Sequence, residues 1–132
     1  MQKRRVNKEG SQSERIISRI FAMSKDIRYV AMYRNGKLVS VSKPDLAGAS
    51  SSESDKYEEI IVNPTLVKLL QQRGDIDCGG IRHVIIHYGN FTQFVHPIEQ
   101  GHISVAFERD RNYARHIPRI KKLLRDENLI LE

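Results

Sequence analysis

The chain has 132 residues, a formal net charge of +6 and a single cysteine. This length suits one domain that buries its core without metal or disulfide staples, and the lone Cys78 excludes an intrachain disulfide and the CxxC metal motifs. No apolar run approaches the ~20 residues of a spanning helix, and none follows the basic start as in a leader, so we expect a soluble, unexported, cytoplasmic protein.

The N-terminal segment is polar and then becomes amphipathic. Residues 1–12 are too polar to pack and are expected to form a basic flexible arm. Ser11 and Glu14 have the spacing of a capping box, which predicts that a helix begins there. Over residues 14–24 the apolar residues recur at helical spacing, which predicts a short amphipathic helix: Ile16, Ile17, Ile20, Phe21 and Met23. The single domain is expected to span residues 13–127, with residues 128–132 as a tail.

The period then changes to two. Residues 28–42 alternate around Asn35-Gly36, a strong hairpin signal because a type I′ turn needs positive φ at both central positions. Four apolar residues fall on one face of this hairpin: Val30, Met32, Val39 and Val41. Residues 43–56 are rich in Ser, Gly and Pro and predict a mobile loop within the domain.

A second helical region covers residues 56–75, and Pro64 leaves two alternatives for it. Either a new helix begins at Pro64 with Asn63 as its N-cap, or a longer helix is kinked at the proline. Gly74 is expected to end the helix in both cases. Glu58 and Glu59 are interpreted as a solvated helix start, because adjacent residues on a helix point in different directions.

The last part of the chain predicts three strands and a helix. The strands are expected at residues 81–88, 91–98 and 102–109, with turns at Gly89-Asn90 and Gln100-Gly101. A basic helix over residues 112–125 closes the domain, and its apolar side consists of Ile117, Ile120, Leu123 and Leu124. The expected order is therefore helix, two strands, helix, three strands, helix.

This order resembles a roadblock-type (dynein light chain-like) domain, and in particular the small stand-alone roadblock-like proteins of archaea. The resemblance rests on IRYVAMYRNGKLVS as first hairpin, LVKLLQQRGDID running into GGIRHVIIHYGNFTQFVHPI, and GHISVAFERD before the last helix. It covers roughly residues 13–124. It implies an α+β, profilin-like fold, in which a five-stranded antiparallel sheet is sandwiched by helices in the order α-β-β-α-β-β-β-α.

The resemblance also implies a homodimer formed through the third strand and the middle helix. The residues support this independently, because the expected edge strand 81–88 has no proline, no bulge signal and charge only at Arg82. Pairing with a symmetry mate is the simplest closed solution for such an edge. The residues predicted at the interface are Arg82, His83, Val84, Ile85, Ile86, His87, Leu66, Leu69 and Leu70.

Three histidines on the expected second hairpin are candidate metal ligands. A two-residue loop pairs Ile85 with Phe94 and His83 with His96, and places His87 one register away. Because no Asp, Glu or Cys shares their predicted face, we interpret them as sheet histidines satisfied by backbone, water or a neighbour rather than as a metal site. A further alternative is that protonated imidazoles near a dimer edge repel each other and make association depend on pH.

The sequence carries no catalytic signature. It has no GxxxxGK[ST], GxGxxG or GxSxG pattern, so neither a phosphate loop nor a nucleophile elbow is expected. Cys78 has no adjacent cation that would activate it, and a turn position is the better interpretation. We therefore expect no enzyme activity, no cofactor and no metal.

The last helix points to a partner. Its basic residues Arg115, Arg119, Lys122 and Arg125 should form an outward stripe that binds an acidic partner, with ordinary solvated surface as the alternative. The predicted function is a non-catalytic homodimeric scaffold or regulatory module that binds a protein, with a small GTPase or another nucleotide-driven system as candidate. A basic nucleic-acid-associated domain is the alternative, weakened because only Tyr113 interleaves the charges. A small-ligand sensor is a further one.

Overall fold

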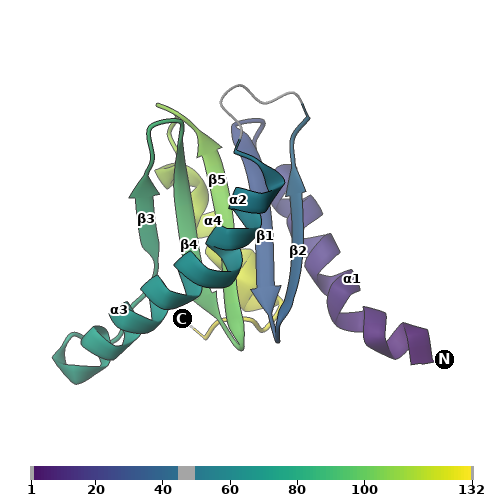
Figure 1. Ribbon diagram of the computed structural model, residues 1–132, viewed down its shortest axis with the longest axis horizontal. Coiled ribbons are helices and arrows are strands. Elements are labelled where there is room, and N and C mark those ends of the chain that lie inside the picture. Colours follow the sequence, from purple (N-terminus) through teal and green to yellow (C-terminus); the bar gives the residue numbers. More distant parts are fainter. Residues whose placement is uncertain (1, 45–49, 132) are drawn as a thin grey trace.

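An antiparallel sheet of five strands, in the order β2-β1-β5-β4-β3, forms the centre of the molecule (Figure 1). The computed structural model describes residues 2–44 and 50–131. The strands are β1 (Ile27–Arg34), β2 (Lys37–Ser42), β3 (Val84–His87), β4 (Phe91–Ile98) and β5 (Gly101–Glu108). The predicted α+β class, the sheet and the order of helices and strands are confirmed.

Two helices cover one face of the sheet. Helix α1 (Gln2–Phe21) and helix α4 (Ile117–Asp126) lie on the far side of the sheet in Figure 1. Their apolar side chains join those of the strands in the main core, which includes Ile16, Ile17, Ile20, Val30, Met32, Phe94, Ile103, Val105, Phe107, Ile120, Leu123 and Leu124. Burying one such side chain stabilises the fold by ~1.5–3 kcal/mol. The apolar stripes predicted for both helices are thus the surfaces that face the sheet.

A single helical region covers the other face. It consists of α2 (Ser52–Tyr57), a π-helical turn (Glu58–Val62) and α3 (Asn63–Asp77), and it runs without interruption. Of the two alternatives for Pro64, the longer helix is correct. Asn63 has helical angles, φ −66° and ψ −43°, so the prediction of an N-cap there was wrong. Proline has no N–H to donate to the preceding turn, which is consistent with the widened turn directly before Pro64.

Several helix ends differ from the prediction. Helix α1 begins at Gln2 rather than at Ser11 and ends at Phe21. Gln, Lys, Arg and Glu are good helix formers, so residues that look too polar to pack still continue a helix. Helix α2 begins within the predicted loop, and the Ser51 side chain caps it by accepting from the Ser54 N–H. Residues 45–49 of that loop lie outside the described residues.

Gly74 does not end the middle helix, which continues to Asp77. Its carbonyl accepts hydrogen bonds from the N–H groups of Cys78 and Gly80, so the chain after the helix folds back onto this turn. A Cβ atom at Gly74 would lie 3.0 Å from the carbonyl carbon of Gly80. The glycine therefore permits a close approach of helix and loop.

The first hairpin has the predicted turn. Asn35 and Gly36 both have positive φ, 52° and 77°. Val30 lies opposite Val41, and Met32 lies opposite Val39, as the alternation requires.

The later strands agree in register but differ at their ends. Ile85 pairs with Phe94 as predicted, and Gly89-Asn90 connect β3 to β4. Strand β3 begins at Val84 rather than at residue 81. The next turn is Glu99-Gln100, because Ile98 pairs with Gly101, which already belongs to β5. A 3-10 turn (Ala114–His116) precedes α4, whose first turn contains Pro118. Within the described residues, no helix is long and apolar enough to cross a membrane.

Candidate functional site

The outer side of the middle helical region carries large exposed apolar side chains. Leu69 is 59% exposed and Ile76 is 75% exposed, and Tyr57, Ile60, Ile61 and Leu70 are exposed as well. Figure 1 shows why the second half of α3 is uncovered: it projects past the β3 edge of the sheet, so that no strand lies beneath it. Large apolar side chains left exposed on one helical region are candidates for contact with another protein.

Strand β3 forms the neighbouring edge. It pairs with β4 and lies at the end of the sheet. Ile85 packs against the main core, whereas Val84 and Ile86, the residues on either side of it, point to the opposite face. All three are half-buried, and the described strand contains neither a proline nor a bulge that would protect it from another strand.

The residues predicted for a dimer interface gather on this side of the molecule. Arg82 and His83 lead into β3, the next four residues form it, and Leu66, Leu69 and Leu70 lie on α3. The chain passes from α3 to β3 through residues 78–83, and both elements lie on the same side of the molecule in Figure 1. We call this surface, the β3 edge with the exposed side of α3, the edge surface.

The histidines of the second hairpin are held by neighbours. His96 is buried, and its Nδ1 lies 2.6 Å from the Pro97 carbonyl oxygen. The His87 Nδ1 lies 3.1 Å from the Thr92 hydroxyl. The rings of His83 and His96 are 6.3 Å apart. In the part of the chain that the structure describes, no group of three or more His, Cys, Asp or Glu residues is placed to hold a metal ion.

A buried polar cluster lies between the middle helical region and the sheet, and the sequence analysis missed it. We define the polar cluster as Glu59, Asn63, His102 and Ser104. Glu59 is 0% exposed, so its interpretation as part of a solvated helix start was wrong. Its Oε1 lies 2.7 Å from the His102 Nε2 and accepts hydrogen bonds from Ser104 Oγ at 2.6 Å and Asn63 Nδ2 at 3.1 Å. This one carboxylate oxygen joins the helical region to β5.

The π-helical turn places the cluster. Glu59 lies within it and Asn63 directly follows it, and both side chains turn toward the sheet. A signal for the cluster was present in the strand GHISVAFE: His102, Ser104 and Ala106 alternate with Ile103, Val105 and Phe107. The second set faces the main core, so the first set faces the middle helix.

Glu58 differs from its neighbour because it lies at the margin of the same interface. The Tyr88 hydroxyl donates to its Oε2 at 2.7 Å. The Gln93 amide lies between the two carboxylates, and with its nitrogen turned toward Glu58 it donates to Oε2 at 2.8 Å. Burial raises the pKa of Glu58, because removing the carboxylate from water makes its charged form less stable.

The polar cluster contains a carboxylate, an imidazole and a hydroxyl, but it is closed to substrate. His102 is 2% exposed and Ser104 is 0% exposed. A nucleophile and a base must reach the atoms on which they act. We therefore interpret the polar cluster as the attachment of the middle helix to the sheet rather than as a catalytic centre.

The predicted basic stripe lies on the face of the molecule opposite α3. Arg115, Arg119, Lys122 and Arg125 are all exposed. Local contacts include that of Lys122 Nζ, 2.9 Å from Asp126 Oδ2, and that of the Arg115 Nε, which donates to His116 Nε2 at 3.3 Å. Burial, and then the charges of Arg115 and Arg119, lower the pKa of His116 beside the stripe.

Comparison with known proteins identifies the fold. No protein-family model matches the sequence, and no curated protein matches it. Several solved structures match the chain, and two of them cover most of it. A roadblock/LC7 domain from Streptomyces avermitilis is 14% identical, with a TM-score of 0.63 over 86% of this chain and 92% of that one. A structure of MglB in a tetrameric arrangement is 10% identical, with a TM-score of 0.65 over 90% of this chain and 91% of that one. The chain therefore has the roadblock fold, in agreement with the resemblance of its hairpins and element order.

Proposed function

We propose that the protein is a non-catalytic homodimeric scaffold or regulatory module that binds a protein partner. The observation that carries this proposal is the edge surface, in which an unprotected strand edge adjoins exposed leucines of a projecting helix. The matched structure of MglB in a tetrameric arrangement supports association through this fold. Because the sequence resembles roadblock-type domains, the candidate partner is a small GTPase or another nucleotide-driven protein.

The geometry of the edge supports a dimer. A β3 edge that meets its own symmetry mate continues the sheet across a two-fold axis and satisfies backbone groups on both copies. In that arrangement the projecting halves of two α3 helices cover each other, which buries Leu69 and Leu70. Ile85 is a poor position for a test because it packs against the core of its own chain. Leu69 is a better one, because it is exposed.

Replacing Leu69 with lysine is expected to dissociate the dimer without unfolding the chain. Losing the burial of this side chain on both copies costs about 3 kcal/mol or more, which raises the dissociation constant by roughly 100-fold. Light scattering should give twice the chain mass of 15.2 kDa for the wild type and one chain mass for Leu69→Lys. The matched control is Val41→Lys, which places lysine at an exposed valine on the opposite edge strand, β2. A wild-type protein that is monomeric at micromolar concentration contradicts the proposal.

We propose the basic stripe as the surface that contacts an acidic partner. Replacing Arg115, Arg119 and Lys122 with glutamine lowers the net charge from +6 to +3 (6 − 3). Because these side chains are exposed, the melting temperature should change little. Capture of the partner from native extract should fall, and the wild-type interaction should weaken as salt rises.

The matched control for the stripe replaces with glutamine three lysines that are exposed before β1, on β2 and on α2, and it reaches the same net charge of +3: Lys25, Lys37 and Lys56. Retention of the partner by this control, and its loss by the stripe variant, separates the stripe from net charge. Equal recovery by both variants shows that the stripe is solvated surface. A captured species that nuclease treatment removes favours the nucleic-acid alternative instead.

A further inference from the structure

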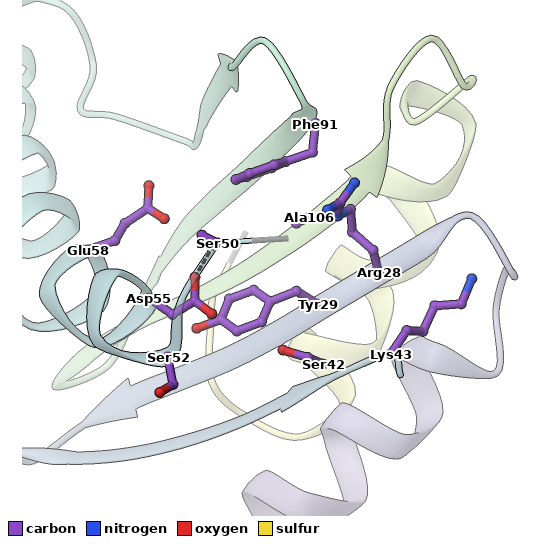
Figure 2. Close-up of a pocket in the computed structure, with 10 residues that line it drawn as sticks. All are labelled: Arg28, Tyr29, Ser42, Lys43, Ser50, Ser52, Asp55, Glu58, Phe91 and Ala106. Atoms are coloured by element: carbon purple, nitrogen blue, oxygen red, sulfur yellow. Dashed lines mark hydrogen bonds between the residues drawn. The ribbon is translucent and has the colours of Figure 1, made fainter. Parts of the chain in front are cut away.

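A pocket with a volume of about 290 Å³ lies between the start of the middle helical region and the sheet. This volume is at the small end of the ~300–1,000 Å³ range of pockets that bind small molecules. Figure 2 shows the side chains that surround it. They come from segments far apart in the sequence and are Arg28, Tyr29, Ser42, Lys43, Ser50, Ser52, Asp55, Glu58, Phe91 and Ala106.

Opposite charges occupy opposite ends of this pocket. Arg28 and Lys43 lie at one end, whereas Asp55 and Glu58 lie at the other (Figure 2). The rings of Tyr29 and Phe91 lie between the two charged ends. The pocket is therefore dipolar, with an aromatic middle.

The cationic end is held in place before any ligand arrives. The Arg28 side chain is 5% exposed, and its Nη1 donates to Glu108 Oε1 at 3.1 Å and to the Asn90 carbonyl oxygen at 3.2 Å. The guanidinium also lies 5.2 Å from the centre of the Phe91 ring. A guanidinium and an ammonium at the same end of a pocket favour a carboxylate, and a guanidinium that is already held in place loses less entropy on binding.

The acidic end favours a cation. Asp55 accepts a hydrogen bond from the Ser50 hydroxyl, and Glu58 accepts one from Tyr88. Burial raises the pKa of Glu58, so a positive group at this end would offset the cost of its charge. Burial, and then the nearby Glu59 carboxylate, raise the pKa of the Tyr29 hydroxyl, so this group stays a neutral polar group of the pocket wall.

We propose that this pocket binds a small zwitterion whose carboxylate and ammonium are separated by a flat apolar body. The carboxylate lies at Arg28 and Lys43, the ammonium lies at Asp55 and Glu58, and the body lies between Tyr29 and Phe91. A simple anion is disfavoured because it meets two carboxylates at the far end, and a simple cation is disfavoured by Arg28 and Lys43. This site is independent of the edge surface, so its test does not depend on dimerisation.

Calorimetric titration of the full chain with three related probes tests the proposal. The zwitterion is para-(aminomethyl)benzoate; para-methylbenzoate lacks its ammonium, and para-methylbenzylamine lacks its carboxylate. Each missing charged contact should weaken binding by about tenfold or more. Absence of binding of the zwitterion at about 10 mM, or equal affinity for all three probes, overturns the proposal.

Variants at the two ends locate the binding. Lys43→Gln should weaken the binding of the zwitterion and of para-methylbenzoate by about tenfold. Asp55→Asn should weaken the binding of the zwitterion and of para-methylbenzylamine by about tenfold. Lys37→Gln and Asp126→Asn are the matched controls, because they make the same charge changes at exposed residues on β2 and α4. Loss of binding in these controls to the same extent overturns the assignment to the pocket. If a pocket variant fails to fold, the comparison of the three probes on the wild-type chain still decides the outcome.

Discussion

Replacing Glu59 with alanine is expected to lower the free energy of unfolding by about 3–5 kcal/mol. The change removes a buried carboxylate and leaves its hydrogen-bond partners buried without it. The His102, Ser104 and Asn63 donors, which converge on one carboxylate oxygen, would lose that acceptor. Each buried donor left without a partner costs ~1–3 kcal/mol. For a chain of 132 residues this corresponds to a fall in Tm of roughly 10–20 °C.

Urea unfolding followed by circular dichroism measures this loss. The matched control is Glu14→Ala, which removes an exposed glutamate from α1 and should change the free energy of unfolding by no more than ~0.5 kcal/mol. His102→Ala and the double variant with Glu59→Ala complete a cycle. The double variant should lose less than the sum of the single variants, because both changes break the same contact. Additive losses, or an effect of Glu59→Ala as small as that of the control, would show that the polar cluster does not act as a unit.

Replacing Gly101 with alanine is expected to be the second most damaging change. A Cβ atom at this position would lie 1.9 Å from the Tyr33 carbonyl oxygen and 2.8 Å from the Arg34 Cα. Both contacts are with backbone of β1, so the strands must separate to admit the methyl group. Overpacking of this kind typically costs ~1–3 kcal/mol, and the backbone contact places this case at or above the upper end.

Gly89→Ala is the matched control for this prediction. Gly89 lies in the turn between β3 and β4, where an added Cβ would have no atom within 4 Å. Thermal unfolding should therefore show a large fall in Tm for Gly101→Ala and little change for Gly89→Ala. Equal melting temperatures for the two variants would contradict the close approach of β5 and β1.

The parts of this fold that depend on neighbouring residues could be predicted from local sequence patterns. Asn35-Gly36 specifies its turn because both residues tolerate positive φ, and the observed values agree. Alternation then sets which side chains face the core, so the Ile85–Phe94 register follows from the hairpin. The apolar side of α4 was predictable for the same reason, since helical spacing is a local property. The order of these elements was enough to indicate the roadblock fold.

Helix ends were predicted less well because capping and loop composition are weak local preferences. The capping pattern at Ser11 did not mark the start of α1, which begins at Gln2. The Ser-rich composition did not prevent α2 from beginning at Ser52. Gly74 has a low helix propensity, yet it lies inside α3. A glycine is needed at this position because Gly80 approaches the helix closely there.

The polar cluster and the dipolar pocket could not be predicted, because both depend on contacts between distant segments of the chain. Glu59 meets Ser104 across 45 residues of sequence, and Arg28 meets Asn90 across 62. Periodicity states which face a side chain occupies, but it carries no information about which distant polar group lies opposite. The sequence pattern therefore predicted that Glu59 is exposed on the helix, whereas packing of the helix against the sheet buries it. There, a buried carboxylate is stable because His102, Ser104 and Asn63 supply the hydrogen bonds that water no longer provides.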